Sequence, residues 1–180
     1  MKTIIALAAA AALAAGTAPA GAALGTGTKA PDFTTTGALA GKPFRLHLKQ
    51  QLRRGPVVLY FFPKAFTKGC TLEAHAFSDA AAEFRKLGAT VVGMSADDYD
   101  SLRRFSVEEC RNAFPVAMAS TATIRDYDVR FKAGAALTNR TSYVIAPDGS
   151  IISAYSDLNW QNHVANTLAA VKAWRAKQRR

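Results

Sequence analysis

A single cysteine, Cys70, follows a strongly apolar run and precedes a segment with helical periodicity. Residues 57–62 show no alternation of polar and apolar side chains, which is typical of a strand buried on both faces. Pro63 ends that strand, and apolar residues then recur at helical spacing from Leu72 to Leu87. Cys70 is therefore expected in or just before a first helical turn, where unpaired backbone N–H groups and the helix dipole favour a thiolate. The chemistry indicated is nucleophilic attack by sulfur.

The residues around this cysteine carry a family resemblance. Pro63, Thr67 and Cys70 are spaced as proline, three residues, threonine, two residues, cysteine, and Glu73 follows. This spacing is the signature of the peroxiredoxins, and the chain resembles the Q-type (bacterioferritin-comigratory-like) branch of the alkyl hydroperoxide reductase and thiol-specific antioxidant family. The resemblance starts at the sequence Ala-Pro-Asp-Phe of residues 30–33 and covers most of the chain. It implies a thiol-dependent peroxidase that reduces hydrogen peroxide or organic hydroperoxides through a sulfenic acid on Cys70.

The same resemblance assigns roles to three further residues. Thr67 would supply a hydroxyl donor, Pro63 would shield the thiolate and shape its loop, and Arg140 would provide a fixed cation that favours the thiolate and holds the peroxide. Without the resemblance, Arg140 would be interpreted as a surface arginine beside a turn. No metal or organic cofactor is implied. The histidines share no metal-ligand spacing with either cysteine or with one another, which favours structural roles for all three: His47, His75 and His163.

Cys110 is the candidate resolving cysteine, again by resemblance. Many Q-type relatives place a resolving cysteine five residues after the first, but His75 occupies that position. Other members place it in the next helix, which is expected here over residues 98–111. On a helical wheel Cys110 lies about 100° from the centre of the apolar stripe, so we expect a reachable thiol that forms an intramolecular disulfide with Cys70 after oxidation. In the reduced fold the two cysteines are expected to be too far apart to bond. A buried structural Cys110 is the alternative.

The remaining pattern predicts alternating strands and helices. Strands are expected at 44–49, 89–94 and 114–118, a β-hairpin at 141–155 around Pro147-Asp148-Gly149-Ser150, and a closing helix at 160–177. This order is typical of an α/β thioredoxin-like fold, a mixed central sheet flanked by helices. Cys70 would then lie at the carboxyl end of the central strand, where sites of such sheets occur.

The N-terminus has the features of a secretory signal peptide over residues 1–22. Lys2 precedes an apolar stretch from Ile4 to Ala15, and Ala18-Pro19-Ala20 is a small-x-small cleavage site. The apolar stretch is shorter than the ~20 residues that span a bilayer, which disfavours the alternative of a membrane anchor. We therefore expect a peroxiredoxin domain over residues 25–178 in a periplasmic or otherwise exported protein, without stable membrane insertion after cleavage.

Composition and charge limit the choice of partners. The chain has 23 Lys and Arg against 13 Asp and Glu, a formal charge of +10, but these basic residues are spread along the sequence, which disfavours nucleic-acid binding. Expected partners are the hydroperoxide and a thioredoxin-like reductant protein, with a monomer as the expected state by resemblance. Two other functions remain open. An exported thiol-disulfide oxidoreductase is disfavoured because no C-x-x-C pair is present, and a redox-inactive domain would join Cys70 and Cys110 in a permanent disulfide.

Overall fold

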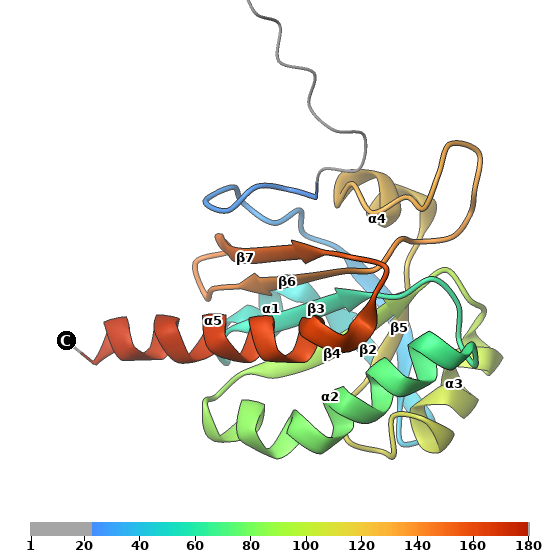
Figure 1. The fold of residues 1–180 in the computed structure, drawn as a ribbon, viewed down its shortest axis with the longest axis horizontal. Coiled ribbons are helices and arrows are strands. Elements are labelled where there is room, and N and C mark those ends of the chain that lie inside the picture. Colours follow the sequence, from blue (N-terminus) through green and yellow to red (C-terminus); the bar gives the residue numbers. More distant parts are fainter. Residues whose placement is uncertain (1–22, 180) are drawn as a thin grey trace, which may run out of the picture.

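The computed structural model describes residues 23–179, which form one seven-stranded mixed sheet with helices on both faces (Figure 1). The strand order is β2-β1-β5-β4-β3-β6-β7. The strands are β1 (Thr34–Leu39), β2 (Lys42–His47), β3 (Val57–Phe61), β4 (Thr90–Ser95), β5 (Val116–Met118), β6 (Thr141–Ile145) and β7 (Ile151–Ser156). The helices are α1 (Leu48–Leu52), α2 (Lys68–Lys86), α3 (Tyr99–Glu108), α4 (Thr121–Asp126) and α5 (His163–Gln178), with a 3-10 turn η1 (Trp160–Asn162) before α5. This arrangement confirms the predicted α/β thioredoxin-like fold.

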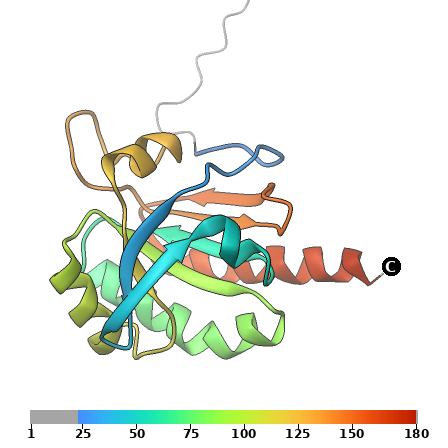
Figure 2. The ribbon, with the colours of Figure 1, turned by 180° about the vertical axis from the view of Figure 1, so that it is seen from behind.

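β3 is the strand between the two halves of the core, and all five of its residues are buried, as the unbroken apolar run predicts. It pairs in parallel with β4 and antiparallel with β6. Val58 and Tyr60 enter the cluster beneath α2, α3 and α5, whereas Leu59 and Phe61 enter the cluster beneath α1 and α4. Figure 2 shows α1 on the face turned away from α5. Each such side chain stabilises the fold by about 1.5–3 kcal/mol through burial.

α2 begins earlier than its apolar periodicity indicates. Thr67 is its N-cap, with extended backbone angles, and the N–H of Thr71 donates to the Thr67 carbonyl at 2.9 Å. Lys68 and Gly69, the first two helical residues, carry no apolar signal, which is why the pattern misses them. Cys70 is therefore the third residue of the first turn, as predicted.

α3 ends earlier than predicted, and this corrects the placement of Cys110. Asp98 caps the helix by accepting the N–H of Ser101 at 2.8 Å. The helix stops at Glu108, and Arg111 and Asn112 adopt left-handed backbone angles, with φ of 48° and 60°. Cys110 therefore lies beyond the helix, so the helical wheel does not apply to it.

The predicted strand at 44–49 also ends early, because Leu48 and Lys49 begin α1. Their N–H groups donate to the Phe33 carbonyl and the Asp32 carboxylate, at 3.2 and 3.1 Å, rather than to a strand. The predicted signal peptide, residues 1–22, lies outside the described residues. Within residues 23–179, no helix is long and apolar enough to cross a bilayer, and no three His, Cys, Asp or Glu side chains are grouped as metal ligands would be.

Candidate active site

The loop between β3 and α2 is held in place by the neighbouring strand ends. The Phe62 carbonyl accepts a hydrogen bond from Thr138 at 2.7 Å, and its N–H donates to the Met94 carbonyl at 3.0 Å. Further along, the Ala65 N–H donates to the Asp97 carboxylate at 2.8 Å, and that carboxylate also accepts from Ser95 at 2.6 Å. The loop thus enters α2 at a defined position.

Cys70 occupies the first turn of α2 and is only 2% exposed. The N–H groups of the first turn have no carbonyl partner within a helix, and they give the helix end a partial positive charge. The thiol therefore lies where an anion on sulfur, or on an oxygen bound beside it, is stabilised.

Arg140 joins the site from the residue just before β6, and its guanidinium makes three contacts. Nε donates to the Leu158 carbonyl at 2.8 Å, Nη1 donates to the Glu73 carboxylate, and Nη2 lies 3.5 Å from the sulfur of Cys70. The side chain is buried, with Arg140 5% exposed. Because three acceptors fix its planar fork, the cation is held against the sulfur instead of extending into solvent.

Gly69 leaves the room that this guanidinium needs. A Cβ atom at residue 69 would lie 3.2 Å from Arg140 Nη2 and 4.0 Å from a ring carbon of Trp160. The first of these distances is tighter than ordinary van der Waals contact, so a side chain here would press on the arginine.

Glu73 lies one helical turn after Cys70 and is fully buried. Burial raises the pKa of Glu73 to about 8, although Arg140 acts in the opposite direction. One carboxylate oxygen faces Arg140, and the other, Oε1, lies 3.8 Å from Nδ1 of His163. His163, the first residue of α5, is also fully buried, and burial lowers its pKa to about 4.

The structure places Thr67 at the N-cap of α2 and Pro63 in the loop before it, and the hydroxyl of Thr67, expected by resemblance to be a donor in the site, has another partner. The Thr67 hydroxyl donates to the Lys64 carbonyl at 2.9 Å, so it supplies no hydrogen bond to Cys70. Pro63 is half-buried beside the buried Phe62. Phe66 has a φ of 62°, a left-handed angle that is uncommon for an aromatic residue and holds the loop in a tight turn.

Cys110 is not the reachable thiol that the sequence predicts. It is fully buried in the same apolar cluster as Cys70, and burial raises its pKa well above the ordinary value. The two cysteines are free, which contradicts a permanent disulfide. The Cys110 carbonyl accepts a hydrogen bond from the Ser78 hydroxyl on α2 at 2.9 Å. The carboxylate of the adjacent Glu109 lies 2.8 Å from Nε2 of His75, also on α2.

Sequence reasoning misses several residues of this site. Glu73 is recognised only as a branch feature, not as the partner of Arg140, and His163 is expected to be structural. Neither Asp97 nor Gly69 carries a functional signal in the sequence. Glu73 offers one usable signal, because an acidic residue on the buried face of an apolar helix needs a partner.

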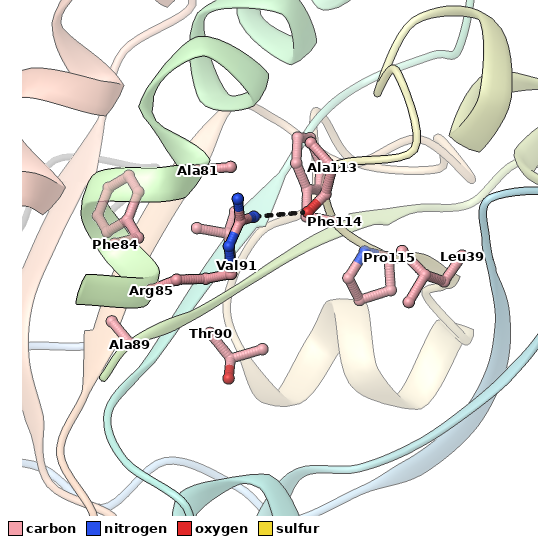
Figure 3. A pocket seen from close by; sticks show the side chains of 10 residues that line it. All are labelled: Leu39, Ala81, Phe84, Arg85, Ala89, Thr90, Val91, Ala113, Phe114 and Pro115. Carbon is pink, nitrogen blue, oxygen red and sulfur yellow. Dashed lines mark hydrogen bonds between the residues drawn. The ribbon is translucent and has the colours of Figure 1, made fainter. Parts of the chain in front are cut away.

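A cavity of about 160 Å³ lies elsewhere, near the C-terminal end of α2 (Figure 3). Its lining includes Phe84 and Arg85 of α2 together with Phe114 and Pro115, and the Arg85 guanidinium donates to the Ala113 carbonyl at 3.4 Å. Neither cysteine lines it, so the reactive group is not in this cavity.

Comparison with known proteins matches this geometry to one family. A sequence model described as the AhpC/TSA family matches residues 26–154. The chain is 34% identical to the chloroplastic peroxiredoxin Q of Arabidopsis thaliana, over 82% of this chain and 67% of that protein. It is 33% identical to the peroxiredoxin Bcp of Xanthomonas campestris pv. campestris, over 68% of this chain and 79% of that protein.

A solved structure agrees with the sequence comparisons. The crystal structure of the peroxidoxin BcpB from Mycobacterium tuberculosis superposes with a TM-score of 0.72 at 33% identity, covering 82% of this chain and 96% of that one. The chain therefore belongs to the AhpC/TSA family and is a peroxiredoxin similar to the Q-type members, that is, a thiol-dependent peroxidase.

Proposed function

We propose that Cys70 is the residue that reduces the hydroperoxide. The observation that carries this proposal is the position of its sulfur in the first turn of α2, 3.5 Å from the Arg140 guanidinium. The thiolate attacks one peroxide oxygen, an S–O bond forms while the O–O bond breaks, and the other oxygen leaves as hydroxide or alkoxide. After one proton is taken up, the products are the Cys70 sulfenic acid and water or an alcohol.

The donors around the sulfur suit the charge that develops in this step. Arg140 and the N–H groups of the first turn lie where the peroxide oxygens would bind. Pro63 and Thr67 act less directly. The Thr67 hydroxyl stabilises the loop by donating to the Lys64 carbonyl. We assign both residues to shaping the loop that covers the thiolate.

Cys110 is the proposed resolving residue. Its thiol attacks the sulfenic sulfur of Cys70, so that an intramolecular disulfide and one molecule of water form. Because Cys110 is buried, the segment that carries it must first leave the core. Arg111, the residue after Cys110, has a left-handed φ of 48°, which is uncommon for arginine and supports a local rearrangement of this segment.

The test is peroxide consumption by the reduced protein with a dithiol reductant. Cys70→Ser should abolish consumption, and turnover that survives this substitution would exclude the proposal. Cys110→Ser should leave the first turnover intact, abolish the intramolecular disulfide seen by mass spectrometry, and increase sulfinic acid at Cys70. If Cys110→Ser cycles normally with the same reductant, Cys110 takes no part in resolution.

The cellular setting is part of the proposal. Peroxiredoxins act on hydroperoxides with thioredoxin-type reductants, and for this chain we propose a monomer that is exported after cleavage of residues 1–22. The charged start, short apolar stretch and small-x-small site support export. Residues 1–24 fused to a reporter that is active only outside the cytosol should give activity, and Lys2 or Ala20 substitutions should reduce it. A silent reporter would refute export.

A further inference from the structure

One oxygen of the buried Glu73 carboxylate, Oε1, is not the oxygen that contacts Arg140. Oε1 of Glu73 is buried and has no hydrogen-bond partner among the described residues. Nδ1 of His163 lies 3.8 Å from this oxygen, beyond hydrogen-bond distance. A buried carboxylate oxygen without a donor is unfavourable, so this arrangement needs a chemical explanation.

The hydrogen bonds of His163 determine which form of the imidazole faces Glu73. Nε2 lies 2.9 Å from the Asp157 carbonyl, which can only accept, so Nε2 carries the ring proton. Nδ1 of the neutral ring is then a lone pair, and it accepts the hydroxyl of Ser142 at 2.8 Å. Because this lone pair is taken by Ser142 and Nδ1 carries no proton, His163 offers no donor to the Glu73 oxygen 3.8 Å away. A buried carboxylate oxygen without a donor disfavours the charged form, so the protonated carboxyl is favoured.

Among the other groups around Glu73, Arg140 favours the charged carboxylate, and burial outweighs it. Tyr60 on β3 is buried with an unpaired hydroxyl and a raised pKa, so it brings no charge. Tyr155 on β7 packs edge-on against the His163 ring, with 4.8 Å between the ring centroids. The Asp157 carbonyl raises the pKa of the His163 imidazole more than the Asp157 carboxylate does, and burial outweighs both. Within residues 23–179, the cation in contact with Glu73 is Arg140, which Glu73 shares with Cys70.

We propose that His163 is a positioning residue that holds Glu73 in its protonated form, so that the guanidinium of Arg140 serves the Cys70 thiolate. This inference rests on the proposed role of Cys70. In the resting site the Cys70 thiol and the Glu73 carboxylate exchange one proton, giving a thiolate and a carboxylic acid with no change in net charge. After the thiolate cleaves the O–O bond, the leaving oxygen needs one proton, and protonated Glu73 holds one proton in reserve.

The experiment measures the ionisation of the two groups directly, without peroxide. The first readout is the infrared band of a buried protonated carboxyl at pH 7, assigned by its loss in Glu73→Gln. The second is the rate at which iodoacetamide alkylates Cys70 between pH 5 and 9. Neither readout requires peroxidase activity, so a failure of this inference can be distinguished from a failure of the proposed function.

Two substitutions should act in opposite directions. His163→Gln keeps a donor for the Asp157 carbonyl but removes the lone pair at Nδ1, so alkylation at pH 7 should fall about tenfold, the effect of roughly one hydrogen bond. Ser142→Ala removes the competing donor from Nδ1, so the carboxyl band should persist and alkylation should rise up to about fivefold. If His163→Gln does not fold, the wild-type band and Ser142→Ala still decide the question.

The decisive comparison is His163→Gln in the Glu73→Gln background. The amide that replaces the carboxyl in this background has no acidic proton to lose, so His163→Gln should then change alkylation by less than about twofold. An equal tenfold loss in both backgrounds would mean that His163 acts only through packing. Absence of a Glu73 carboxyl band in the wild-type protein at pH 6–7 would overturn the proposal outright.

Discussion

Replacing the guanidinium of Arg140 should slow the reaction of Cys70 with hydrogen peroxide by at least about 100-fold at pH 7. The substitution is Arg140→Met, which keeps an unbranched side chain and removes the charge. Nη2 lies 3.5 Å from the sulfur, and at an effective dielectric constant of about 20 this separation corresponds to about 5 kcal/mol between unit charges. Glu73 contacts the same guanidinium, so the net stabilisation of the Cys70 thiolate is smaller than this.

The expected loss has two parts that pH can separate. A neighbouring opposite charge shifts a proton equilibrium by about one to three powers of ten, and loss of a donor to the reacting oxygens costs about 100-fold to 1,000-fold. At pH 9 the thiolate forms more readily without help, so the first part should shrink and the second should remain.

The assay is single-turnover oxidation of the pre-reduced protein followed by stopped flow. Arg140→Lys should be intermediate, because an ammonium keeps the charge but cannot make the three contacts of the guanidinium. Arg103→Met on α3 is the matched control, since that arginine is exposed and pairs with Asp100 at 3.7 Å. A folded Arg140→Met protein that reacts within threefold of wild type would refute this reasoning.

Three further substitutions probe the surroundings of the site. In Gly69→Ala the new methyl group should displace Arg140 and lower the rate of reaction with peroxide about tenfold in stopped flow. Because alanine favours a helix over glycine, the melting temperature of the protein in calorimetry should be unchanged or higher. Glu73 binds its proton more tightly in the folded state than in the unfolded state, so the free energy of unfolding that this proton contributes is lost as pH rises from about 4.5 to about 8. In urea titrations over this pH range, Glu73→Gln should lack this decline. His75→Ala removes the contact with the segment of Cys110, so labelling of Cys110 by a thiol reagent in the native protein should accelerate severalfold. Unchanged labelling would show that this contact does not hold the segment in place.

Local patterns predict the parts of this protein that local physics determines. The unbroken apolar run of residues 57–62 contains the buried central strand β3, which ends at Phe61, two residues before Pro63. The hairpin around Pro147-Asp148-Gly149-Ser150 joins β6 to β7. Cys70 lies in the first turn of α2, as the helical periodicity after Pro63 predicts.

Features that depend on tertiary packing escape the sequence. The contact between Arg140 and Cys70 is indicated only by family resemblance, because β6 and α2 meet through the fold rather than along the chain. The buried pair of Glu73 and His163 depends on the first residue of α5 lying beside the first part of α2, two segments far apart in the sequence. Cys110 is misplaced because the wheel extends α3 through Arg111, where the backbone has already turned left-handed.

The most direct test of the central claim is to trap the oxidised form of Cys70. Reduced protein receives one equivalent of hydrogen peroxide in the presence of dimedone, which reacts with sulfenic acids, and the adduct is located by peptide mass spectrometry. Cys110→Ser is used so that the sulfenic acid is not consumed by a disulfide. The adduct should lie on Cys70 and should decrease strongly in Arg140→Met at pH 7. An adduct absent from Cys70, while peroxide is still consumed, would contradict the account.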